Sequence, residues 1–126
     1  MFSGEQYGKA EEAMGFYTSI LKDSEILSIQ RYGPGEIGKE GTVKVGRFTV
    51  NSAELMASDA PGDHGFSFTP SISLFVECES EAELDAAFGS LIDGGQALMP
   101  LAHYGFSSKF GWVQDKYGVS WQLNLA

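Results

Sequence analysis

One order of elements occurs twice along the chain, an amphipathic helix followed by three strand-like segments. A helix is predicted over 80–93, where apolar residues share one helix face at positions Leu84, Ala87, Phe88, Leu91 and Ile92. Ser80 with Glu83 has the form of a capping box, and Gly94-Gly95 ends the helix. An earlier helix is predicted over 9–21, with its apolar face made by Ala10, Ala13, Met14, Tyr17, Ile20 and Leu21.

Segments rich in β-branched and aromatic residues surround these helices and are predicted as strands. They cover 26–32, 43–50 and 54–58 after the first helix, 72–78 before the second, and 96–101, 110–114 and 119–125 after it. A constant slide places Ala10-Glu11 over Ala82-Glu83 and Phe16 over Phe88. We therefore expect one α+β domain over 1–126 made of two βαβββ halves, about 1–62 and 70–126. The strand before the first helix is expected to be almost missing, because the sequence begins at Met1-Phe2.

Charge and cysteine content exclude some classes of partner. The formal net charge is −9, and the 8 Lys and Arg residues form no run, so nucleic acid and anionic membranes are not expected partners. The single cysteine, Cys78, lies in an apolar run and is expected to be a buried, inert thiol. No membrane-length apolar stretch or signal pattern is present, and the cytoplasm is the expected location.

Strand alternation predicts a polar sheet face built from two separate segments. In the last strand Ser120, Gln122 and Asn124 share one face, opposite the apolar residues Val119, Trp121, Leu123 and Leu125. In the middle strand Ser71, Ser73 and Phe75 lie opposite Ile72, Leu74 and Val76, and the apolar sets are expected beneath the helices. Uncharged polar groups mixed with aromatic residues favour a small-ligand pocket, with a solvated sheet face as the alternative.

Further residues are candidates for the walls and chemistry of this pocket. Phe66, Phe68 and Trp112 fit a pocket wall or the core equally, and Tyr104, Phe106 and Phe110 cluster nearby in the sequence. His103 is a candidate base or ligand contact, with an ordinary loop role as the alternative. Glu54 is a candidate catalytic base if its carboxylate points into the pocket, and a surface residue otherwise.

Two short motifs are interpreted as turns. The glycines of residues 33–38 match G-x-G-x-x-G, but a strand pattern follows where a nucleotide-binding loop requires a helix, so a hairpin is expected. Asp115 to Gly118 is predicted to be a tight turn, with the Asp115 side chain bonding its own backbone.

Three segments carry a resemblance to a known family. Ala10 to Tyr17, Ser71 to Val76 and Gly111 to Leu123 look like the PhnB-like branch of the glyoxalase/bleomycin resistance/dioxygenase (vicinal oxygen chelate) superfamily. The resemblance implies paired βαβββ modules in a curled, cup-like mixed sheet, usually within a homodimer. Members of this branch are often labelled demethylubiquinone methyltransferases, a label that we discount because the glycine motif does not fit a nucleotide loop.

The resemblance also implies where a divalent metal would bind in superfamily enzymes. The four ligand positions map to a residue before Met1, then to Glu54, Ser71 and Gln122, which is a poor metal-ligand set. We therefore expect no cofactor and a small-ligand-binding protein, with Ser71, Ser73, Gln122, Asn124, Phe66, Phe68, Trp112 and His103 as ligand contacts. The alternatives are a metal-dependent lyase, isomerase or dioxygenase with Glu54 as base, and a structural role without a small ligand.

Overall fold

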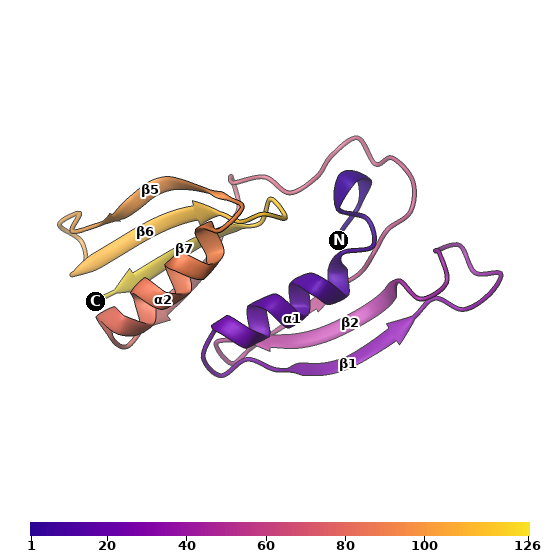
Figure 1. Cartoon of the computed structure of the whole chain (residues 1–126), viewed down its shortest axis with the longest axis horizontal. Coiled ribbons are helices and arrows are strands. Elements are labelled where there is room, and N and C mark those ends of the chain that lie inside the picture. Colours follow the sequence, from indigo (N-terminus) through magenta and orange to yellow (C-terminus); the bar gives the residue numbers. More distant parts are fainter. The chain divides into compact units, whose positions relative to one another are not determined.

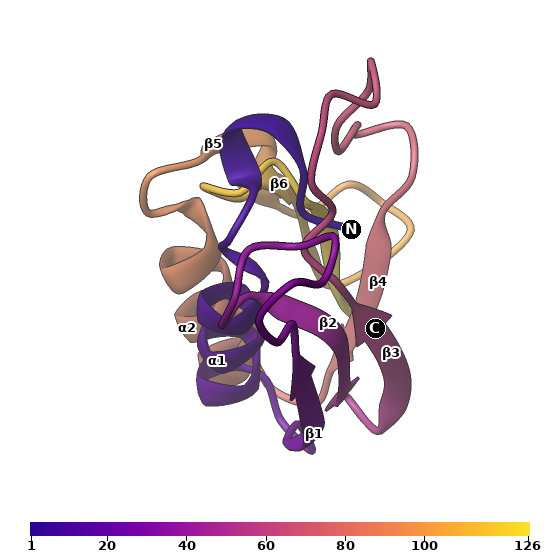
Figure 2. The same cartoon turned by 90° about the vertical axis from the view of Figure 1, so that its right-hand side faces the viewer.

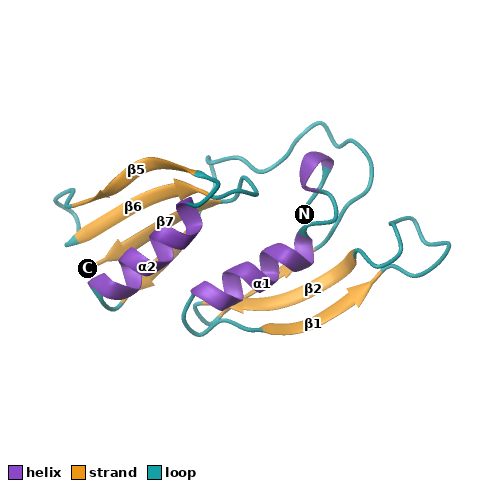
Figure 3. Cartoon of the chain, in the orientation of Figure 1, coloured by secondary structure: helices purple, strands orange, loops and turns teal.

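The computed structural model describes all 126 residues and divides into two compact units, Met1–Ser67 and Phe68–Ala126. Each unit has one α-helix packed on one β-sheet, and a long irregular segment joins the last strand of the first unit to the first strand of the second (Figure 3). No helix in either unit is long and apolar enough to cross a membrane.

The first unit contains a short 3-10 helix, Gly4–Gln6, followed by the helix α1 (Ala10–Ile20) and three antiparallel strands. The strands are β1 (Ile26–Arg31), β2 (Val43–Val50) and β3 (Ala53–Ala57), in the sheet order β1-β2-β3. The helix α1 runs along the sheet (Figure 1) and buries its predicted apolar face, made by Ala10, Ala13, Met14 and Tyr17.

Just beyond the end of β3, one residue near the N-terminus pairs with the chain. Phe2 forms a parallel bridge with Asp59, in which the Phe2 amide donates to the Ser58 carbonyl at 2.7 Å and the Ala60 amide donates to Phe2 at 2.9 Å. The buried Asp59 carboxylate then accepts from the amides of Gly8, Ala10 and Val43. This carboxylate therefore joins the start of α1 to the start of β2, in a position that helix N-termini favour for negative charge.

The second unit has the same connectivity with its first strand complete. It contains β4 (Leu74–Cys78), α2 (Glu81–Ile92), β5 (Gln96–Ala102), β6 (Lys109–Gln114) and β7 (Ser120–Leu125). The sheet order is β4-β7-β6-β5, with β4 parallel to β7 and the other pairs antiparallel. Figure 1 shows β5, β6 and β7 side by side, and β4 is labelled in Figure 2. The predicted α+β class and all of the predicted helices and strands are confirmed, with bounds that differ by at most two residues.

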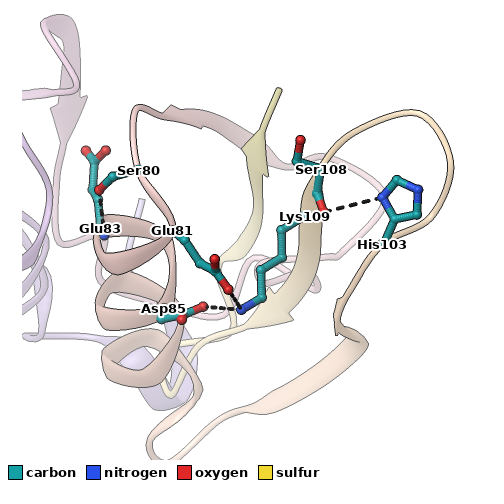
Figure 4. A network of polar contacts seen from close by, with 7 residues as sticks. All are labelled: Ser80, Glu81, Glu83, Asp85, His103, Ser108 and Lys109. Atoms are coloured by element: carbon teal, nitrogen blue, oxygen red, sulfur yellow. Dashed lines mark hydrogen bonds and ion pairs between the residues drawn. The ribbon is translucent and has the colours of Figure 1, made fainter.

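The start of α2 is fixed by side chains. Ser80 Oγ accepts from the Glu83 amide at 3.1 Å, and the Glu83 carboxylate accepts from the Glu79 amide at 2.6 Å, which confirms the predicted cap. On the sheet side, Lys109 Nζ donates to Glu81 at 3.0 Å and to Asp85 at 2.7 Å (Figure 4). Hydrogen bonds to the Asp85 and Glu81 carboxylates raise the pKa of Lys109, so this link between α2 and β6 stays charged.

Each helix lies against its sheet at a glycine. A Cβ on Gly111 of β6 would lie 2.6 Å from a ring carbon of Phe88, and a Cβ on Gly46 of β2 would lie 2.6 Å from the Met14 sulfur. The close approach lets α2 bury Leu84, Ala87, Phe88 and Leu91 against the sheet residues Val76, Val113, Trp121 and Leu123. Burial of these apolar side chains is the main driving force for the folding of each unit.

Two expectations about chain segments are settled by the strand bounds. Residues 33–38 lie in the connection between β1 and β2, where Glu36 accepts from the Gly33 amide and from Lys44, so the predicted hairpin is confirmed. The hydrogen bond from Lys44 lowers the pKa of Glu36. The expectation that Ile72 packs beneath a helix is wrong, because β4 begins only at Leu74 and Ile72 is 77% exposed.

Candidate functional site

The second unit presents a sheet face that turns away from α2. Because Gly111 faces the ring of Phe88, its neighbours Phe110 and Trp112 point to the opposite side of the sheet. Strand register then assigns further residues to that side: Trp112 pairs with Gln122, and Gln122 pairs with Phe75. We call this side the distal face, and its members on β6, β7 and β4 with the residue before β4 are Phe110, Trp112, Gln114, Ser120, Gln122, Asn124, Ser73, Phe75 and Glu77.

Four distal-face side chains form one hydrogen-bond network. The Trp112 indole N–H donates to Ser120 Oγ at 2.8 Å, the hydroxyls of Ser73 and Ser120 are 2.6 Å apart, and Gln122 Nε2 donates to Ser73 Oγ at 3.2 Å. The network links β6, β7 and the residue before β4. Its groups are uncharged and hydrogen-bonded to one another. Strand alternation predicted Ser73, Ser120 and Gln122 on polar sheet faces, whereas Trp112 was predicted as a pocket wall or a core residue.

One hydroxyl hydrogen of this network has no acceptor within the network. Ser73 and Ser120 each accept one N–H bond, and only one of their two hydroxyl hydrogens lies between them. Ser120 is 2% exposed and Ser73 is half-buried, so the lower-cost arrangement has Ser120 donating to Ser73. Ser73 then presents a free O–H beside the side-chain carbonyl of Gln122, which gives a donor and an acceptor next to each other.

The other end of the distal face is aromatic and carries a carboxylate. Phe110 contacts the rings of Phe75, Tyr104 and Phe106, with centroid distances of 6.4, 6.0 and 5.0 Å. Asn124 pairs with Phe110 across the strands, and its Nδ2 donates to Glu77 at 3.0 Å. Glu77 was missed from the sequence because the alternation was followed only to Phe75, although the next residue but one shares the same face.

A buried carboxylate on the other side of β7 holds the strand that carries the network. Asp115 Oδ1 accepts from the Tyr117 and Val119 amides at 2.9 and 3.0 Å, which confirms the predicted turn. Asp115 Oδ2 also accepts from the indole of the buried Trp121 at 2.9 Å. Asp115 is therefore a structural residue, and it fixes the entry of the chain into β7.

Other predicted ligand contacts of the second unit lie outside the network. Ser71 is exposed and its hydroxyl is 3.2 Å from that of Thr69. His103 is exposed in the β5–β6 loop, with Nδ1 3.4 Å from the Ser108 carbonyl oxygen (Figure 4). Phe68 is half-buried beside Gly118, in the turn that precedes β7. The structure brings together Ser73, Trp112 and Gln122, and places Asn124 two residues further along β7.

Two predicted site residues belong to the first unit. Glu54 lies on β3, is exposed, and forms an ion pair with Arg47 of β2. Phe66 is exposed, with its ring 5.7 Å from that of His64. Both roles therefore remain predictions.

The buried Cys78 is a free thiol, and burial raises its pKa to about 11, so it is protonated at neutral pH and is a poor nucleophile.

The residues at the mapped metal positions do not fit a divalent metal centre. The Glu54 carboxylate forms an ion pair with Arg47, the Ser71 hydroxyl is hydrogen-bonded to that of Thr69, and the Gln122 amide donates to Ser73. One carboxylate, one hydroxyl and one amide lack the imidazole or thiolate ligands of a tight site. The chain holds no group of three or more His, Cys, Asp or Glu side chains placed to hold a metal ion.

Comparison with known proteins places the chain in a family. Residues 1–124 match the family model described as 3-demethylubiquinone-9 3-methyltransferase. The chain belongs to this family. It is 57% identical to a Bacillus cereus PhnB protein described by the same activity, over 95% of this chain and 93% of that one, with a TM-score of 0.90. No curated protein matches the chain.

More distant solved structures share the fold of this PhnB-like family. The protein PA1353 of Pseudomonas aeruginosa is 25% identical over 94% of this chain and 90% of its own, with a TM-score of 0.79. A glyoxalase/bleomycin resistance protein/dioxygenase superfamily member from Sphaerobacter thermophilus is 14% identical over 92% and 87%, with a TM-score of 0.52. The expected PhnB-like membership and glyoxalase/bleomycin resistance fold are therefore confirmed.

Proposed function

We propose that this PhnB-like chain is a small-molecule-binding protein that needs no metal, and that the distal face of its second unit is the binding surface. The network of Ser73, Ser120, Gln122 and Trp112 carries the proposal, because it is a set of polar groups already fixed in place before a ligand arrives. Preformed sites of this kind combine aromatic walls with a few placed polar groups.

The free donor and acceptor of the network define the chemistry that it accepts. The Ser73 hydroxyl and the Gln122 side-chain carbonyl match the carbonyl and N–H of an amide, or the two oxygens of a protonated carboxyl group. The half-buried indole of Trp112 lies beside them and supplies an apolar wall. A ligand held in this way needs no metal to polarise it, in agreement with the donor set at the mapped ligand positions.

We predict that a fragment library screened by saturation-transfer NMR contains hits whose binding depends on this network. Gln122→Leu should weaken their binding by at least about tenfold, the effect of one lost hydrogen bond with an unpaired partner. Gln30→Leu, the same exchange on an exposed β1 position of the first unit, should leave binding unchanged.

Dialysis against EDTA tests the metal-free part of the proposal separately and should leave the affinity unchanged. A fall in affinity that added Zn²⁺ or Mn²⁺ restores would contradict it. Hits that survive both Gln122→Leu and Ser73→Ala would contradict the assignment of the distal face.

We further propose that the chain acts as a homodimer in the cytoplasm. The strand β3 is the last in the sheet order β1-β2-β3, and the bridge from Phe2 reaches only Asp59, beyond the end of β3. An open strand edge of this kind is a surface that a second chain covers readily. Sedimentation equilibrium should give twice the chain mass of 13.6 kDa, and a monomer at micromolar concentration would contradict the dimer.

The buried free thiol of Cys78 supports a reducing compartment, and recovery of the chain outside the cytoplasmic fraction would overturn that location.

A further inference from the structure

Three aromatic rings, one amide and one carboxylate gather at one end of the distal face, next to Gln122 and opposite the end that carries Ser73 and Ser120. We call Phe75, Phe106, Phe110, Asn124 and Glu77 the aromatic end. Phe75 is 54% exposed and Phe106 is 66% exposed, whereas Phe110 between them is buried. The rings of Phe75 and Phe106 are therefore open to solvent. Each contacts the Phe110 ring, with centroid distances of 6.4 and 5.0 Å, and these contacts hold both rings in place.

Asn124, which pairs with Phe110 across the strands, supplies an unpartnered acceptor at this end. The residue is 8% exposed, and its Oδ1 is a buried oxygen without a hydrogen-bond partner. The amide orientation follows from its neighbour, because Nδ2 donates to Glu77 and the reverse orientation would set two oxygens against each other. A buried carbonyl without a donor costs roughly 1 to 3 kcal/mol, so the site favours a molecule that brings an N–H or O–H.

Glu77 supplies a carboxylate that no cation of the chain neutralises. It is exposed, it accepts the one hydrogen bond from Asn124, and it takes part in none of the ion pairs of the structure. The formal net charge of −9 adds a background potential of the same sign. The Glu77 carboxylate and Asn124 Oδ1 are therefore acceptors with unused capacity, one N–H of the Asn124 amide is a further donor, and the charge at this end is negative.

We propose that the aromatic end binds a planar aromatic ring that carries a protonated amino group, a step that rests on the distal face being the binding surface. The ring packs against Phe75 and Phe106, the ammonium pairs with the exposed Glu77, and it donates to Asn124 Oδ1 once the side chains that cover this oxygen move aside. A cation close to the rings gains a further attraction from their π faces. An anionic ring meets the uncompensated Glu77 carboxylate and is rejected.

The test uses one ring in three charge states, with calorimetric titration of 1-naphthylmethylammonium, 1-naphthylmethanol and 1-naphthoate into the whole chain. We expect the ammonium to bind about tenfold more tightly than the alcohol and the carboxylate not to bind. Cyclohexylmethylammonium has the charge without the aromatic ring and should bind at least about tenfold more weakly than its naphthyl counterpart. Equal affinities for the three naphthalenes would overturn the proposal.

Variants assign the effect to named groups. Glu77→Gln should abolish the preference for the ammonium, and Glu40→Gln, the same charge change on an exposed loop of the first unit, should keep it. Asn124→Leu should weaken the ammonium about tenfold while stability is unchanged or raised, because it removes a buried unpaired carbonyl. A strong loss of stability in Asn124→Leu would mark Asn124 as structural and overturn its role here.

The remaining outcomes separate this proposal from the function on which it rests. If no naphthalene binds while library hits still depend on Gln122, the aromatic end is not the cation site and the distal-face function stands. If no hits depend on Gln122 either, both fall. If Phe75→Ala shifts the monomer–dimer equilibrium without changing ligand affinity, the rings serve a second copy of this chain and the proposal is overturned.

Discussion

Asp115→Ala should lower the free energy of unfolding by roughly 3 to 5 kcal/mol, a value at the upper end for single substitutions. Asp115 is 3% exposed and accepts from two amides of its own turn and from the Trp121 indole. Alanine leaves all three donors without this acceptor, two of them buried and the Val119 amide partly buried. Each unpaired buried donor costs about 1 to 3 kcal/mol. Urea unfolding followed by the intrinsic tryptophan fluorescence of the chain measures the change.

Asp63→Ala is the matched control for this loss. Asp63 also accepts a turn amide, that of Gly65 at 2.9 Å, but in an exposed loop where water replaces the carboxylate. We expect it to change the free energy of unfolding by less than about 0.5 kcal/mol. Asp115→Asn should fall between the two, because its amide keeps one oxygen acceptor. An Asp115→Ala protein as stable as the Asp63→Ala protein would show that the buried carboxylate does not hold β7 in place.

Gly95→Ala should lower the free energy of unfolding by about 3 kcal/mol through a steric clash. A Cβ at this position would lie 2.2 Å from the Gln114 carbonyl oxygen and 2.9 Å from the Asp115 Cα, so the backbone at the end of β6 must move. Overpacking of side chains costs about 1 to 3 kcal/mol, and backbone atoms have less freedom to yield. Because the same displacement disturbs Asp115, the thermal midpoint should fall as well.

Gly89→Ala controls for the general effect of replacing glycine. Gly89 lies inside α2, is exposed, and has open space where its Cβ would be. Alanine favours a helix interior over glycine by roughly 0.5 to 1 kcal/mol, so this variant should be more stable than the parent chain. Loss of stability in Gly89→Ala, or none in Gly95→Ala, would contradict the packing described for α2 and β5.

The sequence predicted what short-range patterns determine. The cap at Ser80, the buried face of α2 and the two faces of β7 follow from the spacing of residues along one helix or one strand. The structural role of Asp115 followed from turn chemistry, although its bond to Trp121 did not. The prediction for Ile72 rested on its alternation with Leu74 and Val76. It was wrong because an apolar side chain does not indicate where β4 begins.

The candidate site depends on strand register, which the sequence does not specify. Ser73 and Gln122 are 49 residues apart, and they meet because β4 pairs with β7 in parallel with Phe75 opposite Gln122. The same register brings Glu77 to Asn124 and explains why the charge on this face was missed. The requirement for glycine at position 95 is likewise set by a distant carbonyl, that of Gln114, and no local motif reveals it.

The indole N–H signals of the two tryptophans test the distal face most directly. Trp112 belongs to the hydroxyl network, whereas Trp121 is bonded to Asp115 on the side covered by α2, so the two report on opposite faces of one sheet. In a ¹H–¹⁵N spectrum titrated with 1-naphthylmethylammonium or a library hit, the Trp112 signal should shift progressively while the Trp121 signal stays in place. A saturable ligand that shifts only resonances of the first unit, and leaves Trp112 unmoved, would contradict the account.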